Sequence, residues 1–306
     1  MAFTSKDVMA LREKTGVGMM DCKKALQESD GDFDKAIDYL REKGLAKQAK
    51  KASRVAAEGM AYATVNYDKK VGVVVEVNSE TDFAAKSDKF VEFVKEIADV
   101  IINENPADVD ALLATDVNGQ TVADILRDKV MVIGENLSIR RFVRYEGDCV
   151  AYVHGGGRIG VLVKFEADAA ASGSEALIEC GKDIAMQIAA LNAPYLDEAS
   201  VPAEVVEHEQ EVQLALIKND PKNASKPEAV LEKMIIGKMR KYFEENCLVN
   251  QAFVKDGSLT VGQYVEQQAK VAGGEMKLTA FVRFEKGEGI EKREDDFASE
   301  VASMVK

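Results

Sequence analysis

The sequence is poor in the residues on which most enzymes depend. Its 306 residues include no tryptophan, two histidines, four cysteines and five prolines. Neither His154 nor His208 shows the spacing to cysteine or carboxylate that zinc sites require. Scarce histidine also disfavours acid–base and nucleophilic catalysis. We therefore expect no metal site, no catalytic residues, no cofactor and no enzyme activity.

An excess of positive charge and long apolar runs are missing as well. Acidic residues number 53 against 40 basic ones, and the net charge is −13. This balance disfavours direct nucleic-acid or anionic-membrane partners. No apolar run approaches the roughly 18 residues of a membrane span, and the first residues lack a signal-peptide core. The scattered cysteines form no CxxC pair, which is typical of free thiols. We expect a cytoplasmic globular protein.

Three short helices are expected at the start of the chain. The pattern predicts helices over Ser5–Thr15, over Met19–Ser29, and from an N-cap at Asp32 to Gly44. Three helices in so short a stretch make a small core, which is typical of a docking module. The basic stretch Lys47–Arg54 that follows is typical of a solvated linker, with a phosphate-binding patch as the alternative.

The hydrophobic period changes from Gly59 onward. Strands are expected at 60–65, 71–77, 137–145, 149–153 and 159–165, and helices at 88–103, 121–133 and 175–191. The stretches KKVGVVVEV and GRIGVLVKF resemble each other, and a connector and an amphipathic helix follow each. This repeat predicts an α+β fold whose core has two similar lobes with antiparallel sheets.

Two further helices interrupt this core. Helices over 202–219 and 228–245, separated by a proline-containing break, predict an antiparallel helical hairpin. Its apolar stripe is imperfect, so an arm that mates with another surface fits better than an autonomous coiled coil. The tail predicts a helix after Thr260, a strand over 276–289 and a last helix after Asp296.

The motif GGGRIG, residues 155–160, matches the GxGxxG pattern of dinucleotide-binding sites. That pattern needs a helix directly after it, whereas IGVLVKF predicts a strand. We therefore expect a hairpin turn in which glycine supplies positive φ angles. His154 beside this turn is a candidate partner contact, and a structural histidine is the alternative.

Met19 and Met20 stand side by side at a predicted helix start. Adjacent helical positions lie about 100° apart and cannot both face a small core. One of the two side chains is therefore expected to face outward, where a flexible apolar group suits a partner surface. Packing of both methionines in the core is the alternative.

The stretch NSETDFAAKSDKF places Asp82 directly beside Phe83 at a predicted strand end. In one interpretation Phe83 covers the hydrophobic end of the sheet and Asp82 caps the following turn. In the other, the pair forms a protruding wedge. The ring then enters a pocket of a partner, and the carboxylate perturbs a charged site there.

Four stretches, TGVGMMDCKKAL, NSETDFAAKSDKF, HGGGRIGVLV and FVRFEKGEGIEK, together resemble the bacterial elongation factor Ts family. The resemblance covers the whole chain in the right order. It implies a guanine-nucleotide exchange factor for the translational GTPase elongation factor Tu. It also implies a ubiquitin-associated-like domain at 1–55, core subdomains at 56–170 and at 171–200 with 246–290, a dimerisation insertion at 201–245 and a C-terminal helical module at 291–306.

The same resemblance implies roles for individual residues. Thr81, Asp82 and Phe83 match the family pattern Thr-Asp-Phe-Val, in which Asp and Phe push between helices of the GTPase and help to dislodge its Mg²⁺. Ala84 replaces the valine, which leaves the packing role of that position open.

Met19 and Met20 match family positions that meet the GTPase domain. A homodimer through the helical hairpin stays open. The alternative function is a protein-binding adaptor that uses the N-terminal three-helix module.

Overall fold

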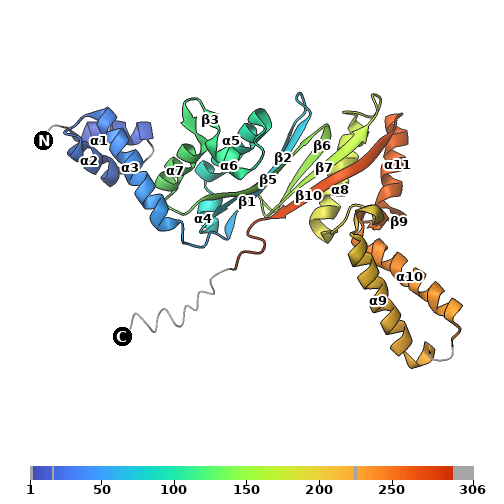
Figure 1. Ribbon diagram of the computed structural model, residues 1–306. Coiled ribbons are helices and arrows are strands. Elements are labelled where there is room, and N and C mark those ends of the chain that lie inside the picture. Colours follow the sequence, from blue (N-terminus) through green and yellow to red (C-terminus); the bar gives the residue numbers. More distant parts are fainter. Residues whose placement is uncertain (1–2, 16, 224–225, 292–306) are drawn as a thin grey trace.

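The computed structural model describes residues 3–15, 17–223 and 226–291 of the chain. Three N-terminal helices precede two three-stranded antiparallel sheets, and a helical hairpin projects from the far end (Figure 1). The two sheets lie face to face with helices on their outer sides. The predicted α+β fold class is therefore confirmed. The last predicted helix, after Asp296, lies outside the described residues.

The N-terminal helices are α1 (Ser5–Thr15), α2 (Met19–Glu28) and α3 (Phe33–Lys51), packed around a small apolar core. The predicted end of the third helix at Gly44 is wrong. A Cβ atom at Gly44 would lie 3.2 Å from Cγ of Met131, so the glycine allows close packing of α3 on a core helix. Because that packing supports the helix, α3 continues into the stretch expected to be a linker.

The first lobe contains β1 (Glu58–Asn66), β2 (Val71–Ser79) and β5 (Ser138–Glu146), in the order β1-β2-β5. All residues of β2 are buried, as its valine-rich sequence favours. Its outer face is covered by α5 (Asp88–Glu104), and α7 (Val122–Ile133) packs beside α5.

The second lobe contains β6 (Asp148–His154), β7 (Ile159–Ala167) and β10 (Met276–Glu285), in the order β10-β7-β6. The helices α8 (Glu175–Leu191) and α11 (Val261–Ala272) cover its outer face. The other described elements are α4 (Asp82–Ala85), α6 (Val109–Ala114), β3 (Asp116–Val117), β4 (Gln120–Thr121), α9 (Ala203–Asn219), α10 (Glu228–Asn246), β8 (Ala252–Phe253), β9 (Asp256–Thr260) and three short 3₁₀ turns.

The two lobes repeat one another in detail. Both α5 and α8 have 17 residues, a serine N-cap and an asparagine C-cap with φ of 48°. Both α7 and α11 have 12 residues, a threonine capping box and a left-handed glycine C-cap. A short hairpin precedes each 12-residue helix. The predicted repeat is confirmed, and it extends well beyond the nine residues seen in the sequence.

The strands β6 and β7 pair with β10 rather than with the first sheet, and Gly147 stands between β5 and β6. We expected the division near residue 170, and we now propose Gly147 instead. The glycine-rich stretch forms the turn between β6 and β7. Its residues Gly155, Gly156 and Gly157 have φ of 59°, 64° and 96°, and a strand follows directly, as predicted.

The helical hairpin is inserted in the second lobe between α8 and β8. Its two ends meet at a bridge between Tyr195 and Cys247. The amide of Tyr195 donates to the carbonyl of Asn246 at 3.2 Å, and the amide of Leu248 donates to the carbonyl of Tyr195 at 2.9 Å. The base of the hairpin is therefore closed by backbone hydrogen bonds.

The two sheets approach closely because each sheet has a glycine that faces the other sheet. A Cβ at Gly72 would lie 2.6 Å from Cδ1 of Leu162, and one at Gly160 would lie 2.9 Å from the carbonyl oxygen of Ala61. Neither position accepts a side chain without displacement of the opposite sheet. The buried residues between the sheets are Ala61, Ala63, Val74, Cys149, Leu162 and Phe284.

A fully buried carboxylate lies at the centre of the first sheet. Glu76 in β2 accepts hydrogen bonds from Arg141 at 2.6 Å, the amide of Gly287 at 2.7 Å, Arg140 at 3.0 Å and Asn78 at 3.1 Å. Burial alone would raise the pKa of Glu76, but these donors outweigh it and hold the pKa below its usual value. Glu76 thereby ties the first lobe to the segment after β10.

We expect Glu76→Gln to lower the free energy of unfolding by about 3 kcal/mol at neutral pH, because two arginines lose their buried partner. The folded-state pKa is depressed, so this stabilisation is present above the unfolded value of about 4.3 and is lost as the pH falls through the folded pKa. Chemical denaturation at several pH values measures both effects.

The matched control is Glu146→Gln at an exposed strand end, which should leave the unfolding midpoint nearly unchanged. Equal midpoints for the wild-type chain and Glu76→Gln at neutral pH would contradict the assignment. So would a difference between them that grows as the pH falls below about 4.

Candidate functional site

The connector after β2 forms a single helical turn, α4. Thr81 is its N-cap, and its hydroxyl oxygen accepts the amide hydrogen of Ala84 at 3.2 Å. Ala84 and Ala85 are the buried residues of this turn, which contacts β1 and β2. The N-cap is therefore Thr81. The interpretation in which Asp82 caps the turn is wrong.

Phe83 projects from this turn into solvent. Its exposed fraction of 84% is the highest of any large apolar side chain in the described part of the chain. A ring that covered the end of the sheet would be buried, so that interpretation of Phe83 is wrong. The wedge interpretation stays the proposal for this turn.

Asp82 carries a negative charge beside the ring. The hydrogen bond from Lys86, at 2.6 Å, lowers the pKa of Asp82, and the same bond raises the pKa of Lys86. The Asp82 carboxylate is therefore ionised at neutral pH and is paired one turn further along the chain. The turn presents an apolar ring and an ion pair together.

A second apolar surface lies on the N-terminal helices. Met9, Met19 and Met20 are 52%, 38% and 74% exposed, and we call these three residues the methionine surface. The alternative prediction, that both Met19 and Met20 pack in the core, is wrong, because Cys22 and Leu26 occupy the core side of α2. We expected one of these two methionines to face outward, and the structure shows that both Met19 and Met20 are exposed.

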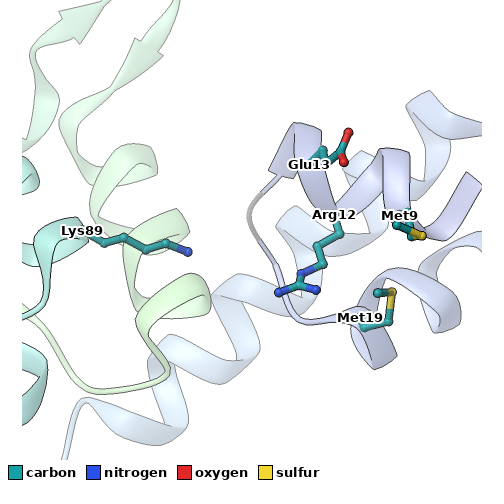
Figure 2. A pocket seen from close by; sticks show the side chains of 5 residues that line it. All are labelled: Met9, Arg12, Glu13, Met19 and Lys89. Carbon is teal, nitrogen blue, oxygen red and sulfur yellow. The ribbon is translucent and has the colours of Figure 1, made fainter. Parts of the chain in front are cut away.

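A hollow of about 350 Å³ lies between the methionine surface and the first lobe. It is lined by Met9, Arg12, Glu13, Met19 and Lys89. Figure 2 shows Lys89 extending from the start of α5 toward the helices that carry the other four residues. Since α5 follows α4 directly, the methionine surface and the Phe83 turn lie at the same end of the first lobe.

His154 is exposed at the end of β6, where its Nδ1 lies 2.9 Å from the hydroxyl of Tyr152. The turn that follows packs on β1, and the carbonyl of Gly157 accepts the amide hydrogen of Ala61 at 2.8 Å. Because α4 also contacts β1, His154 and the Phe83 turn flank the same strand. Its role as a partner contact stays a proposal.

Met9 was not among the contact residues predicted from the sequence. The signal was available, because Val8 and Leu11 are spaced to face the helical core and leave Met9 about 100° away. Lys89 gave no such signal, since only the packing of the N-terminal helices beside α5 brings it to the hollow.

The described residues include no metal-binding cluster and no exposed thiol. Among the described residues there is no cluster of three His, Cys, Asp or Glu side chains that could hold a metal ion. No described helix is long and apolar enough to cross a membrane. All four cysteines are free and buried, and burial raises the pKa of Cys149 to about 11 and that of Cys180 to about 12. Such thiols are poor nucleophiles.

Comparisons with known proteins identify the family. The family model for Elongation factor TS matches residues 80–288. Elongation factor Ts of Clostridium perfringens (strain SM101 / Type A) is 48% identical over 305 residues, which are 98% of this chain and 98% of that protein. The Elongation factor Ts proteins of Clostridioides difficile (strain 630) and Symbiobacterium thermophilum are 47% and 48% identical, with 99% and 97% of this chain and 99% and 96% of their own lengths covered. The chain therefore belongs to the elongation factor Ts family, whose members take part in translation elongation.

Proposed function

We propose that this chain is a guanine-nucleotide exchange factor that acts in the cytoplasm on GDP-bound elongation factor Tu. The observation that carries the proposal is the exposed ring of Phe83 beside the charged Asp82, on a turn fixed by Thr81. Membership of the elongation factor Ts family supports the identity of the partner. The chain would need no cofactor and no covalent chemistry for this activity.

The mechanism follows from how a GTPase holds its nucleotide. A bound nucleoside diphosphate depends on Mg²⁺ and on loop amides to neutralise its phosphate charge. Insertion of the Phe83 ring between helices of the GTPase would displace those loops, and the Asp82 carboxylate would disturb the metal site. By linkage, a protein that weakens nucleotide binding is itself weakened by nucleotide to the same degree.

The architecture of the turn suits insertion into a partner. A turn whose backbone is already ordered loses little conformational entropy when it binds. The N-cap hydrogen bond of Thr81 and the buried Ala84 fix the backbone on both sides of Phe83. We propose that Ala84 supports the turn from below, and that the missing valine methyls change this packing more than the partner contact.

The methionine surface supplies a second contact. Exposed methionines adapt to the shape of a partner, and the 350 Å³ hollow beside Met9 and Met19 offers space for a partner side chain. The adaptor function rests on this surface alone. It predicts binding of a partner protein with no change in nucleotide release.

The helical hairpin carries exposed apolar side chains that have no role in the proposed exchange. They are Val212, Leu216, Val230 and Ile236. These residues support the proposal of a homodimer through the hairpin, because exposed apolar side chains are stabilised when a partner surface covers them.

A catalytic amount of the chain should speed the release of fluorescent GDP from elongation factor Tu by orders of magnitude. The physical reason is that an exchange factor stabilises the nucleotide-free state and is then released by incoming nucleotide. Stopped-flow fluorescence with excess unlabelled GDP measures the rate. Release at the spontaneous rate would reject the exchange function, and binding without faster release would favour the adaptor.

Phe83→Ala should weaken the complex by about 2 kcal/mol or more, because the ring is the main apolar projection. Asp82→Asn keeps the shape of the side chain and removes its charge. Its effect on GDP release should therefore be large at millimolar Mg²⁺ and small after chelation. Titration calorimetry and stopped-flow release with and without Mg²⁺ measure both variants.

The matched control is Tyr67→Ala, an exposed aromatic residue in the turn between β1 and β2, at the other end of the same sheet. It should leave affinity and release unchanged. A lower thermal midpoint in Phe83→Ala with an unchanged release rate would reject the wedge.

Met19→Ala and Met20→Ala should each weaken the complex by roughly 1–3 kcal/mol if their side chains become buried in the partner. The fold should be unaffected, since both side chains are exposed. Val271→Ala on α11 is the control, because it shortens an exposed apolar side chain of the second lobe. Unchanged affinity in both methionine variants would rule out this contact.

A further inference from the structure

The repeat allows the connector that carries Phe83 to be compared with its counterpart in the second lobe. Each middle strand is followed by an acidic residue, Glu80 after β2 and Asp168 after β7. The Glu80 carboxylate accepts the amide hydrogen of Asn136 at 2.6 Å, and that of Asp168 accepts the amide hydrogen of Glu275 at 3.0 Å. This contact joins strand end and helix end in both lobes, so it belongs to the shared architecture.

The residue before that amide differs between the lobes. The glycine caps Gly134 of α7 and Gly273 of α11 correspond, and Glu135 and Gly274 come next. A Cβ at Gly274 would lie 2.3 Å from a carboxylate oxygen of Asp168, so the second lobe has no room for a side chain there. Only the lobe that carries Phe83 has a carboxylate at this position.

The Glu135 carboxylate holds Thr81 by two hydrogen bonds. One oxygen accepts the backbone amide of Thr81 at 3.0 Å, and the other accepts its hydroxyl hydrogen at 2.6 Å. Because the hydroxyl donates to Glu135, its lone pairs are free to accept the amide of Ala84. The hydroxyl of Ser79 donates to the carbonyl of Thr81 at 3.0 Å. Thr81 is thus held at its amide, its hydroxyl and its carbonyl.

Glu135 itself belongs to a fixed segment. The carbonyl of Gly134 accepts a hydrogen bond from Lys51 at the end of α3. The side chain of Asn136 donates to the carbonyl of Arg54 at 2.9 Å, and Leu137 is buried. Figure 1 shows α3, α4 and α7 meeting at one side of the first lobe. The segment therefore contacts both the Phe83 turn and the helix that carries the N-terminal module.

We propose that Glu135 is a positioning residue for nucleotide exchange. Its carboxylate orders Thr81, and through Thr81 the turn that presents Asp82 and Phe83, before the partner binds. Without Glu135 the turn would be ordered only on binding, and that entropy cost would slow exchange. The inference rests on the proposed exchange function and adds a residue that acts through its hydrogen bonds to Thr81.

The test compares GDP release from elongation factor Tu for Glu135→Ala, Glu135→Gln and the wild-type chain. Glu135→Ala should slow catalysed release roughly 3- to 10-fold, since it removes two hydrogen bonds to a charged, partly exposed group. Glu135→Gln should recover part of the rate, because its amide oxygen still accepts from Thr81. Glu92→Ala is the matched control, an exposed glutamate of α5, and should release GDP at the wild-type rate.

A double-variant measurement separates positioning from general damage. In Phe83→Ala only Asp82 is left for Glu135 to position, so Glu135→Ala should slow GDP release by a smaller factor in that background than in the wild-type chain. Amide hydrogen exchange of Thr81 and Ala84 in the isolated chain should become faster in Glu135→Ala, while the protection of β2 is retained.

The outcomes separate the two claims. If the wild-type chain does not speed GDP release, the exchange function fails and the inference fails with it. If the wild-type chain and Phe83→Ala behave as expected but Glu135→Ala releases GDP at the wild-type rate, only the inference is overturned. An additive loss in the double variant also overturns it, because such a loss shows that Glu135 acts independently of the turn.

Discussion

The contact between the two lobes depends on one buried carboxylate. Glu76 accepts hydrogen bonds from Arg141 of β5 and from the amide of Gly287, so one carboxylate joins the first sheet to the segment that follows β10. The glycines at the sheet interface bring the backbones close, and Glu76 supplies the polar link that fixes their position. The strand β2 carries Glu76 and leads directly into the Phe83 turn. The hydrogen bonds of Glu76 that fix β2 therefore also fix the orientation of that turn.

The repeat explains how one fold supports two different lobes. Both lobes use the same strand order, the same helix lengths and the same caps. They differ where the middle strand ends. The first lobe has Thr81, Phe83 and Glu135, and the second has short side chains and Gly274. A structural unit used twice thus carries an apolar projection once, on the lobe beside the N-terminal helices (Figure 1).

Much of the fold could be predicted from the sequence because its signals are local. Valine runs, caps and glycine turns predicted most of the sheet strands and the longer helices, and the GGGRIG stretch could be assigned to a turn from the strand that follows it. The end of α3 was missed because packing of Gly44 against Met131 overrides the weak helix propensity of glycine. The partner of Thr81 was missed because it lies 54 residues away in the sequence. Whether Phe83 is buried or exposed also depends on tertiary structure, and the sequence left both interpretations open.

Because the base of the helical hairpin is closed by hydrogen bonds, the sequence and length of the hairpin can change independently of the second lobe. Backbone hydrogen bonds around Tyr195 and Leu248 complete the second lobe whatever lies between them. The arm can therefore grow, shrink or be exchanged for another segment during evolution while the sheet and its helices keep their sequence. In protein engineering the same junction is an insertion point, where a foreign domain can be joined by both ends at a distance from the Phe83 turn.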